Sequence, residues 1–299
     1  MINRLSFRWL VTAAFAWVAI ATLGSVQAAE KMEPSPFGGR VHALAVNPET
    51  NALFLGAGPV YRSDDDGRTW AKIDGIPKAK EQTNVAAIAI DPRDPNVMYA
   101  SGHGVAVVKS ADGGRTWTRI AAGLPHDSTE AFAIDAQDSS TLYVWVQGAG
   151  LYRSKDAGAS WQKADGGPRG QEIRSLVSLN EPTGMGGLWL YAGLDVGVVK
   201  SPDCFCGWDR LANQGLPTNK RVYSLAADPA RPSVVYAGLQ DGIFKTEDAG
   251  ESWVKVASNV PDAVVAVHPK KAGHVYAASS DGSLFTSRDS GGTWRRLHE

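Results

Sequence analysis

The stretch Ser63-Asp64-Asp65-Asp66-Gly67-Arg68-Thr69-Trp70 decides the fold of this chain, because its pattern Ser-x-Asp-x-Gly-x-Thr-Trp returns five more times. Successive copies end in a tryptophan every 41 to 47 residues, a spacing typical of propeller blades. The fourth copy, at 201–208, lacks the central glycine and the threonine and is therefore degenerate. The aspartate and tryptophan of the six copies are Asp65 and Trp70, Asp112 and Trp117, Asp156 and Trp161, Asp203 and Trp208, Asp248 and Trp253, and Asp289 and Trp294.

The motif has the residue types of a turn between two strands. Serine and aspartate side chains bond to nearby backbone groups, and glycine supplies a positive φ. The tryptophan that follows is expected to begin the outgoing strand as an apolar plug against the neighbouring unit. A calcium loop is the competing interpretation of 64–67, but the bidentate glutamate that closes such a loop is missing.

Each repeat contains four short segments rich in β-branched and aromatic residues, separated by turn signals such as Asp91-Pro92 and Asp241-Gly242. One four-stranded unit cannot bury both of its faces alone, so a radial ring of units is expected. We predict an all-β, six-bladed propeller of antiparallel blades. The first strands of the blades are expected at 41–46, 85–90, 131–134, 173–179, 222–226 and 263–267.

Six copies in phase identify the motif as the Asp-box, and the chain after about residue 40 resembles the Asp-box (BNR) repeat β-propeller superfamily. That superfamily includes sialidases and other glycosidases, sortilin-type receptors and photosystem II assembly factors. The resemblance implies that the boxes are structural turns, distant from the working face of the ring. It also implies that a site, where one exists, lies over the start of the innermost strands.

The N-terminus has the pattern of a secretory signal peptide. Arg4 and Arg8 precede an apolar run from Trp9 to Leu23, and small residues precede a cleavage position after Ala28. We predict a signal peptide at 1–28, a lead-in linker at 29–38 and the propeller at 39–299. The mature protein is then periplasmic or secreted, with no membrane insertion after cleavage.

The composition disfavours several classes of partner and chemistry. Thirty lysines and arginines against 31 aspartates and glutamates give no nucleic-acid footprint. The six histidines have no ligand spacing, so we expect no metal or other cofactor, and surface or turn positions for the histidines. A closed ring protects its strand edges, and we therefore expect a monomer.

The candidate binding residues precede the innermost strands, where the connections between blades end. We hypothesise that Arg40, Arg174 and Arg221 converge there and bind a carboxylate, because arginine pairs bidentately with planar oxyanions. The alternative, which we favour, is that these arginines pair with the carboxylates that share this end of the channel. The candidate carboxylates are Glu130, Glu172 and Asp262, of which Glu130 and Asp262 join the arginines in the predicted binding set.

The sequence names no catalytic residue. The Arg-Ile-Pro motif of sialidases is replaced here by Arg40-Val41-His42, and no tyrosine with a glutamate partner stands out. Glu130 with Asp262 or Glu172 is the alternative, as a glycosidase pair, but the sequence gives no distance between the carboxylates. The function predicted is therefore a non-catalytic binding or assembly scaffold for an envelope or periplasmic protein, as the resemblance to photosystem assembly factors implies. A glycoside hydrolase or glycan-binding protein is the first alternative, and a sortilin-like peptide receptor fragment is the second.

Cys204 and Cys206 stand inside the degenerate fourth motif. An exported compartment oxidises cysteines, so we predict a disulfide between them that substitutes for the missing turn chemistry. A redox or thiolate-metal role is the alternative.

Overall fold

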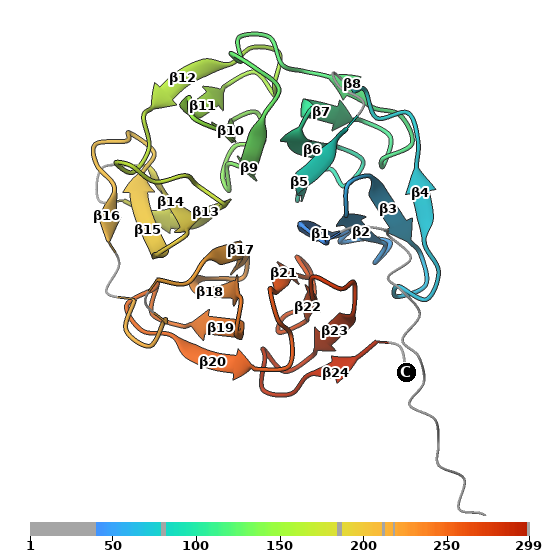
Figure 1. The fold of residues 1–299 in the computed structure, drawn as a ribbon, viewed down its shortest axis with the longest axis vertical. Helices are drawn as coiled ribbons and strands as arrows, with labels where there is room; N and C mark the ends of the chain where they lie inside the picture. Colours follow the sequence, from blue (N-terminus) through green and yellow to red (C-terminus); the bar gives the residue numbers. More distant parts are fainter. Residues whose placement is uncertain (1–39, 79–81, 184–186, 211–212, 218, 298–299) are drawn as a thin grey trace, which may run out of the picture. The chain divides into compact units, whose positions relative to one another are not determined.

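The computed structural model describes residues 40–78, 82–183, 187–210, 213–217 and 219–297, which form six four-stranded antiparallel sheets. Figure 1 shows these sheets as blades arranged around a central channel, with the first strand of each blade innermost. In these ranges the regular elements are all strands, so the predicted six-bladed all-β fold is confirmed. The predicted signal peptide and lead-in lie outside the described residues.

Each blade consists of four strands that follow one another in the chain and in the sheet. Blades one to three comprise β1 (Ala43–Val46), β2 (Leu53–Gly56), β3 (Val60–Ser63) and β4 (Ala71–Ile73); β5 (Asn84–Ile90), β6 (Met98–His103), β7 (Ala106–Ser110) and β8 (Thr118–Arg119); and β9 (Thr129–Ile134), β10 (Leu142–Val146), β11 (Gly150–Ser154) and β12 (Gln162–Asp165). Blades four to six comprise β13 (Ser175–Pro182), β14 (Leu188–Leu194), β15 (Gly197–Pro202) and β16 (Asp209–Arg210); β17 (Val222–Asp228), β18 (Arg231–Leu239), β19 (Gly242–Thr246) and β20 (Val254–Ala257); and β21 (Val264–Val267), β22 (Val275–Ala278), β23 (Leu284–Ser287) and β24 (Arg295–Arg296). The innermost strands begin within two residues of the predicted starts.

The hydrophobic core lies between the blades. Trp117 of blade two packs with Phe54 and Val60 of blade one, and the other box tryptophans likewise pack against the preceding blade. The ring closes in the same way, because Trp70 packs against the cluster that Leu44 of blade one shares with Tyr276 of blade six. Among the described residues, side-chain packing rather than a shared strand therefore joins the first and last blades.

The second and third strands of several blades present an aromatic ring opposite a cation. Tyr99 and Tyr236 are buried in their blades and pair across the sheet with Lys109 and Lys245. The two ammonium groups lie 5.5 and 6.0 Å from the ring centroids, within the range of a cation–π interaction. Lys109 and Lys245 are thus held in place by aromatic rings of their own blades.

Candidate functional site at the inter-blade mouth

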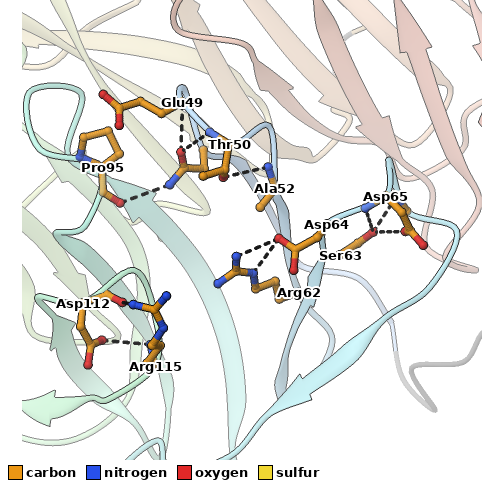
Figure 2. Close-up of polar contacts among 12 residues, drawn as sticks. Glu49, Thr50, Ala52, Arg62, Ser63, Asp64, Asp65, Pro95, Asp112 and Arg115 are labelled. Carbon is orange, nitrogen blue, oxygen red and sulfur yellow. Dashed lines mark hydrogen bonds and ion pairs between the residues drawn. The ribbon is translucent and has the colours of Figure 1, made fainter.

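The Asp-box turns bond to themselves. Asp65 accepts hydrogen bonds from the Ser63 hydroxyl at 2.8 Å and from the backbone and hydroxyl of Thr69 at 2.9 and 2.7 Å. The Ser63 hydroxyl in turn accepts from the Gly67 amide at 2.7 Å, and Figure 2 shows Ser63 and Asp65 facing one another beside the Arg62–Asp64 ion pair. These hydrogen bonds hold the pKa of Asp65 at about 2. The box carboxylate is therefore engaged within its own turn.

Blade four solves the same turn differently. Cys204 and Cys206 are joined by a disulfide, with Cα atoms 5.4 Å apart. Phe205 between them takes the position of the box glycine and keeps a positive φ of 53°. Its ring packs edge-on against Tyr143 and stacks on Trp208, which anchors the turn to blade three. Apolar packing and a covalent link thus stand where the other blades have hydrogen bonds.

At the opposite end of the ring, the connections between blades deliver charged side chains to the channel mouth. Arg174 bonds to Glu130 at 2.6 Å and to Asp195 at 2.8 Å. Arg221 bonds to the other oxygen of Asp195 at 2.6 Å, so this carboxylate bridges two arginines. The three chain segments that meet here belong to blades three, four and five.

Tyr223 connects this network to the joint between blades six and one. The guanidinium of Arg221 lies 5.8 Å from the Tyr223 ring centroid, and that of Arg40 lies 4.7 Å from it. Arg40 also bonds to Asp262 at 2.9 Å. We call this set the arginine belt; it consists of Glu130, Arg174, Asp195, Arg221, Tyr223, Arg40 and Asp262.

The belt contains all five residues of the predicted binding set, and adds Asp195 and Tyr223. Glu172 does not pair with an arginine; it accepts hydrogen bonds from the Trp145 indole at 2.6 Å and the Gly148 amide at 3.2 Å. Asp195 is visible in the sequence only as a polar residue of the turn between β14 and β15. Nothing in its spacing marks it as the shared partner of two arginines.

The belt is balanced in charge, with three guanidiniums and three carboxylates. Hydrogen bonds from Arg174 lower the pKa of Asp195, and the bond from Arg221 adds to this effect. Burial alone would lower the pKa of Arg174, but its bonds to Asp195 and Glu130 outweigh this and raise it. Nearby, burial and the charges of Arg40 and Arg221 lower the pKa of His42, which favours the neutral ring.

The resolved pKa shifts of the carboxyl groups all have one direction. Throughout the described ranges, every carboxyl group with a shifted pKa is shifted downward. At this end of the channel, the cavity lined by His42, Arg174 and Tyr223 has a volume of about 100 Å³. A larger cavity of about 720 Å³ lies beside the belt, lined by Pro168, Val196 and Pro217 among others.

Five of the six histidines lie in the described ranges, at positions 42, 103, 126, 268 and 274. In the part of the chain that the structure describes, no three metal-ligating side chains come together, and no helix is long and apolar enough to cross a membrane. His268 and His274 are 2% and 7% exposed, so of the expected surface or turn positions they take turn positions. His268 does have a turn role, because its Nδ1 accepts the backbone amides of Lys270 and Lys271.

A closed ring of Asp-box blades with a charged inter-blade mouth defines the class of protein as an Asp-box β-propeller. The model of the sortilin/Vps10 family (sortilin, neurotensin receptor 3) matches residues 58–169. Over 116 residues, 37% of this chain, the sequence is 33% identical to vacuolar protein sorting/targeting protein 10 of Aspergillus fumigatus and 32% identical to that of Neosartorya fischeri. The chain spans only 8% of the length of these curated relatives.

Solved structures extend the similarity to most of the ring. The GH74 enzyme of Niastella koreensis superposes with a TM-score of 0.65 at 20% identity, over 87% of this chain and 45% of that one. YCF48 bound to D1 peptide gives a TM-score of 0.55 at 18% identity, over 89% of this chain and 84% of that one. At these identities the likeness concerns the fold. Residues 58–169 thus resemble the sortilin/Vps10 family in sequence, and most of the ring shares the propeller fold of the GH74 and YCF48 structures.

Proposed function

We propose that this protein is an exported, non-catalytic scaffold that binds a protein partner through the arginine belt. The observation that carries the proposal is that Arg40 and Arg221, each 40% exposed in its side chain, both lie within 6 Å of the Tyr223 ring centroid. Arginine and tyrosine are enriched where protein interfaces have their strongest contacts. The belt therefore offers a preformed platform at the inter-blade mouth.

The partner is expected to present carboxylates to this platform. Arg40 and Arg221 are already oriented by Asp262 and Asp195, so a partner carboxylate would gain two arginines without the cost of ordering them. Arg174 has a different role. Its side chain is 17% exposed between Glu130 and Asp195, where it fixes Asp195, the carboxylate that orients Arg221.

Export and a protein partner are supported from outside the belt. The predicted signal peptide at 1–28 directs the chain across a membrane, and the Cys204–Cys206 disulfide fits an oxidising compartment. We place the mature protein in the periplasm on the basis of this signal peptide and this disulfide. Among the similar proteins, YCF48 is seen with a D1 peptide and the fungal relatives are named for vacuolar protein sorting, so protein recognition has precedent on this fold.

Affinity capture from the native cell envelope tests the proposal. We expect the protein to retain a discrete protein partner, and the Arg40→Ala/Arg221→Ala variant to retain at least tenfold less, since two charge-assisted contacts are lost. Arg174 is left intact so that the ion pairs beneath the platform persist. The matched control is Arg62→Ala/Arg68→Ala, which removes two arginines from a box turn at the opposite end of the ring.

Three outcomes would contradict the proposal. The first is equal retention by both double variants, which would place the contact elsewhere on the ring. The second is retention of glycans in place of a protein, and the third is recovery of a shortened glycan. Either glycan result would favour the glycan-binding or glycoside hydrolase alternative.

A further inference from the structure

The channel widens toward the Asp-box end of the ring into a cavity of about 470 Å³. Its walls come from the innermost strands of all six blades, with aliphatic side chains such as Ile90, Ile134, Val177 and Val267 half-exposed to the space. A volume of this size and an apolar lining are typical of small-molecule sites. We call this space the axial funnel.

The polar residues at the rim of the axial funnel are engaged with the protein. Asp91 accepts the Ser139 hydroxyl at 2.7 Å and the Arg93 amide at 2.9 Å. Asp228 is 2% exposed and accepts hydrogen bonds from Nε and Nη2 of Arg231, at 2.9 and 2.7 Å. Proline residues at the starts of these turns complete the rim, so the entrance is mainly apolar.

Arg93 is the exception at the rim. It is exposed and lines the axial funnel, and its guanidinium donates to the backbone carbonyl of Gln137. Within the described ranges it belongs to none of the ion pairs. Hydrogen bonds from Ser140 and Thr141 lower the pKa of Asp138, and the charge of Arg93 adds the smallest contribution. The guanidinium thus keeps donors available beside an apolar cavity.

We propose that the axial funnel binds a medium-chain aliphatic carboxylate, with the chain among the aliphatic walls and the carboxylate on Arg93. An alkyl chain gains from leaving water in proportion to the apolar area it buries. A guanidinium is the side chain that best matches a planar carboxylate. This site lies at the end of the ring opposite the arginine belt, so it is independent of the proposed protein contact.

Calorimetric titration of the purified protein with hexanoate, octanoate and decanoate tests the chain. We expect one site, and about fifteenfold tighter binding for each added pair of methylenes. Equal affinities along the series, or no saturable binding up to decanoate, would overturn the proposal. In a second assay the protein is mixed with phosphatidylglycerol vesicles. Binding to the vesicles without binding of the free acids would indicate that the funnel rim contacts a membrane, and would also overturn the proposal.

Variants test the head group and the location. Arg93→Gln is expected to weaken octanoate binding at least fivefold and to leave octanol binding unchanged, because only the carboxylate needs the cation. Arg68→Gln, an exposed arginine of the blade-one box outside the cavity lining, is the matched control and should change neither. Ala227→Leu narrows the cavity wall and should weaken all three acids. An unchanged octanoate affinity in Arg93→Gln would contradict the assigned head group.

Discussion

Replacement of Gly215 by alanine is expected to cost about 4 kcal/mol of unfolding free energy, or to prevent folding. Gly215 opens the connection from blade four to blade five with a φ of +90°, which is unfavourable for any residue with a Cβ atom. A Cβ built there would lie 2.1 Å from the carbonyl oxygen of Trp253, and this oxygen belongs to the backbone and cannot rotate away. The Trp253 amide also bonds to the Gln214 carbonyl at 2.7 Å, so a shift of the connection disturbs two blades.

Gly75→Ala provides the matched control. Gly75 has nearly the same φ, +83°, in the equivalent Gly75-Ile76-Pro77 connection, but no atom lies within 4 Å of the Cβ position. Backbone strain alone should cost about 1 kcal/mol. Urea unfolding of both variants measures the difference. Similar losses in the two variants would show that the close approach to Trp253 contributes little.

Acidification from pH 7 to pH 4.5 is expected to destabilise the ring by about 3 kcal/mol through His274. Burial, followed by the charges of His268, Arg288 and Lys271, lowers the pKa of His274 from 6.5 to about 4. The unfolded chain binds this proton below about pH 6.5, whereas the folded chain binds it only near pH 4. Stability is therefore full above pH 6.5 and is lost as the pH falls toward 4.

Thermal unfolding measures this effect as a fall in Tm of about 6–12 °C between the two pH values. The box carboxylates add little at pH 4.5, because with a folded pKa of about 2 at Asp65 most of their contribution is lost below the ordinary aspartate pKa of 3.8. His274→Gln should reduce the pH dependence, and the lowered pKa values of His42 and His268 should leave a smaller loss in the same pH range. His103→Gln, at an exposed site, should preserve the full dependence. A pH dependence that survives His274→Gln unchanged would place the titration on another group.

The fold followed from the sequence because each Asp-box needs a hairpin between two strands. Ser63, Asp65 and Thr69 bond within eight residues, so one local pattern reports one blade without any information on distant contacts. The innermost strands could be placed for a related reason, since Pro48 and Pro92 mark where β1 and β5 end. Six such local signals in phase were sufficient for the ring.

The pairings at the mouth could not be derived in the same way. The sequence placed Arg174, Arg221 and Glu130 at one end of the channel, but the position of each blade in the ring decides which groups meet. Asp195 reaches two arginines because it lies on the turn between β14 and β15. Arg174 directly precedes β13 and Arg221 directly precedes β17, and both side chains meet Asp195 there. Glu172 is instead held by the Trp145 indole of the preceding blade. Contacts across blade joints depend on packing that no local pattern records.

Site-specific photocrosslinking in the native envelope tests whether a protein is recognised at the arginine belt. A photoreactive residue would replace Lys220, a partly exposed neighbour of Arg221, in one variant and Arg68 at the Asp-box end in the other. We expect a discrete protein adduct from position 220 and none from position 68. An adduct from position 68 alone would contradict it, as would the absence of any protein adduct from position 220.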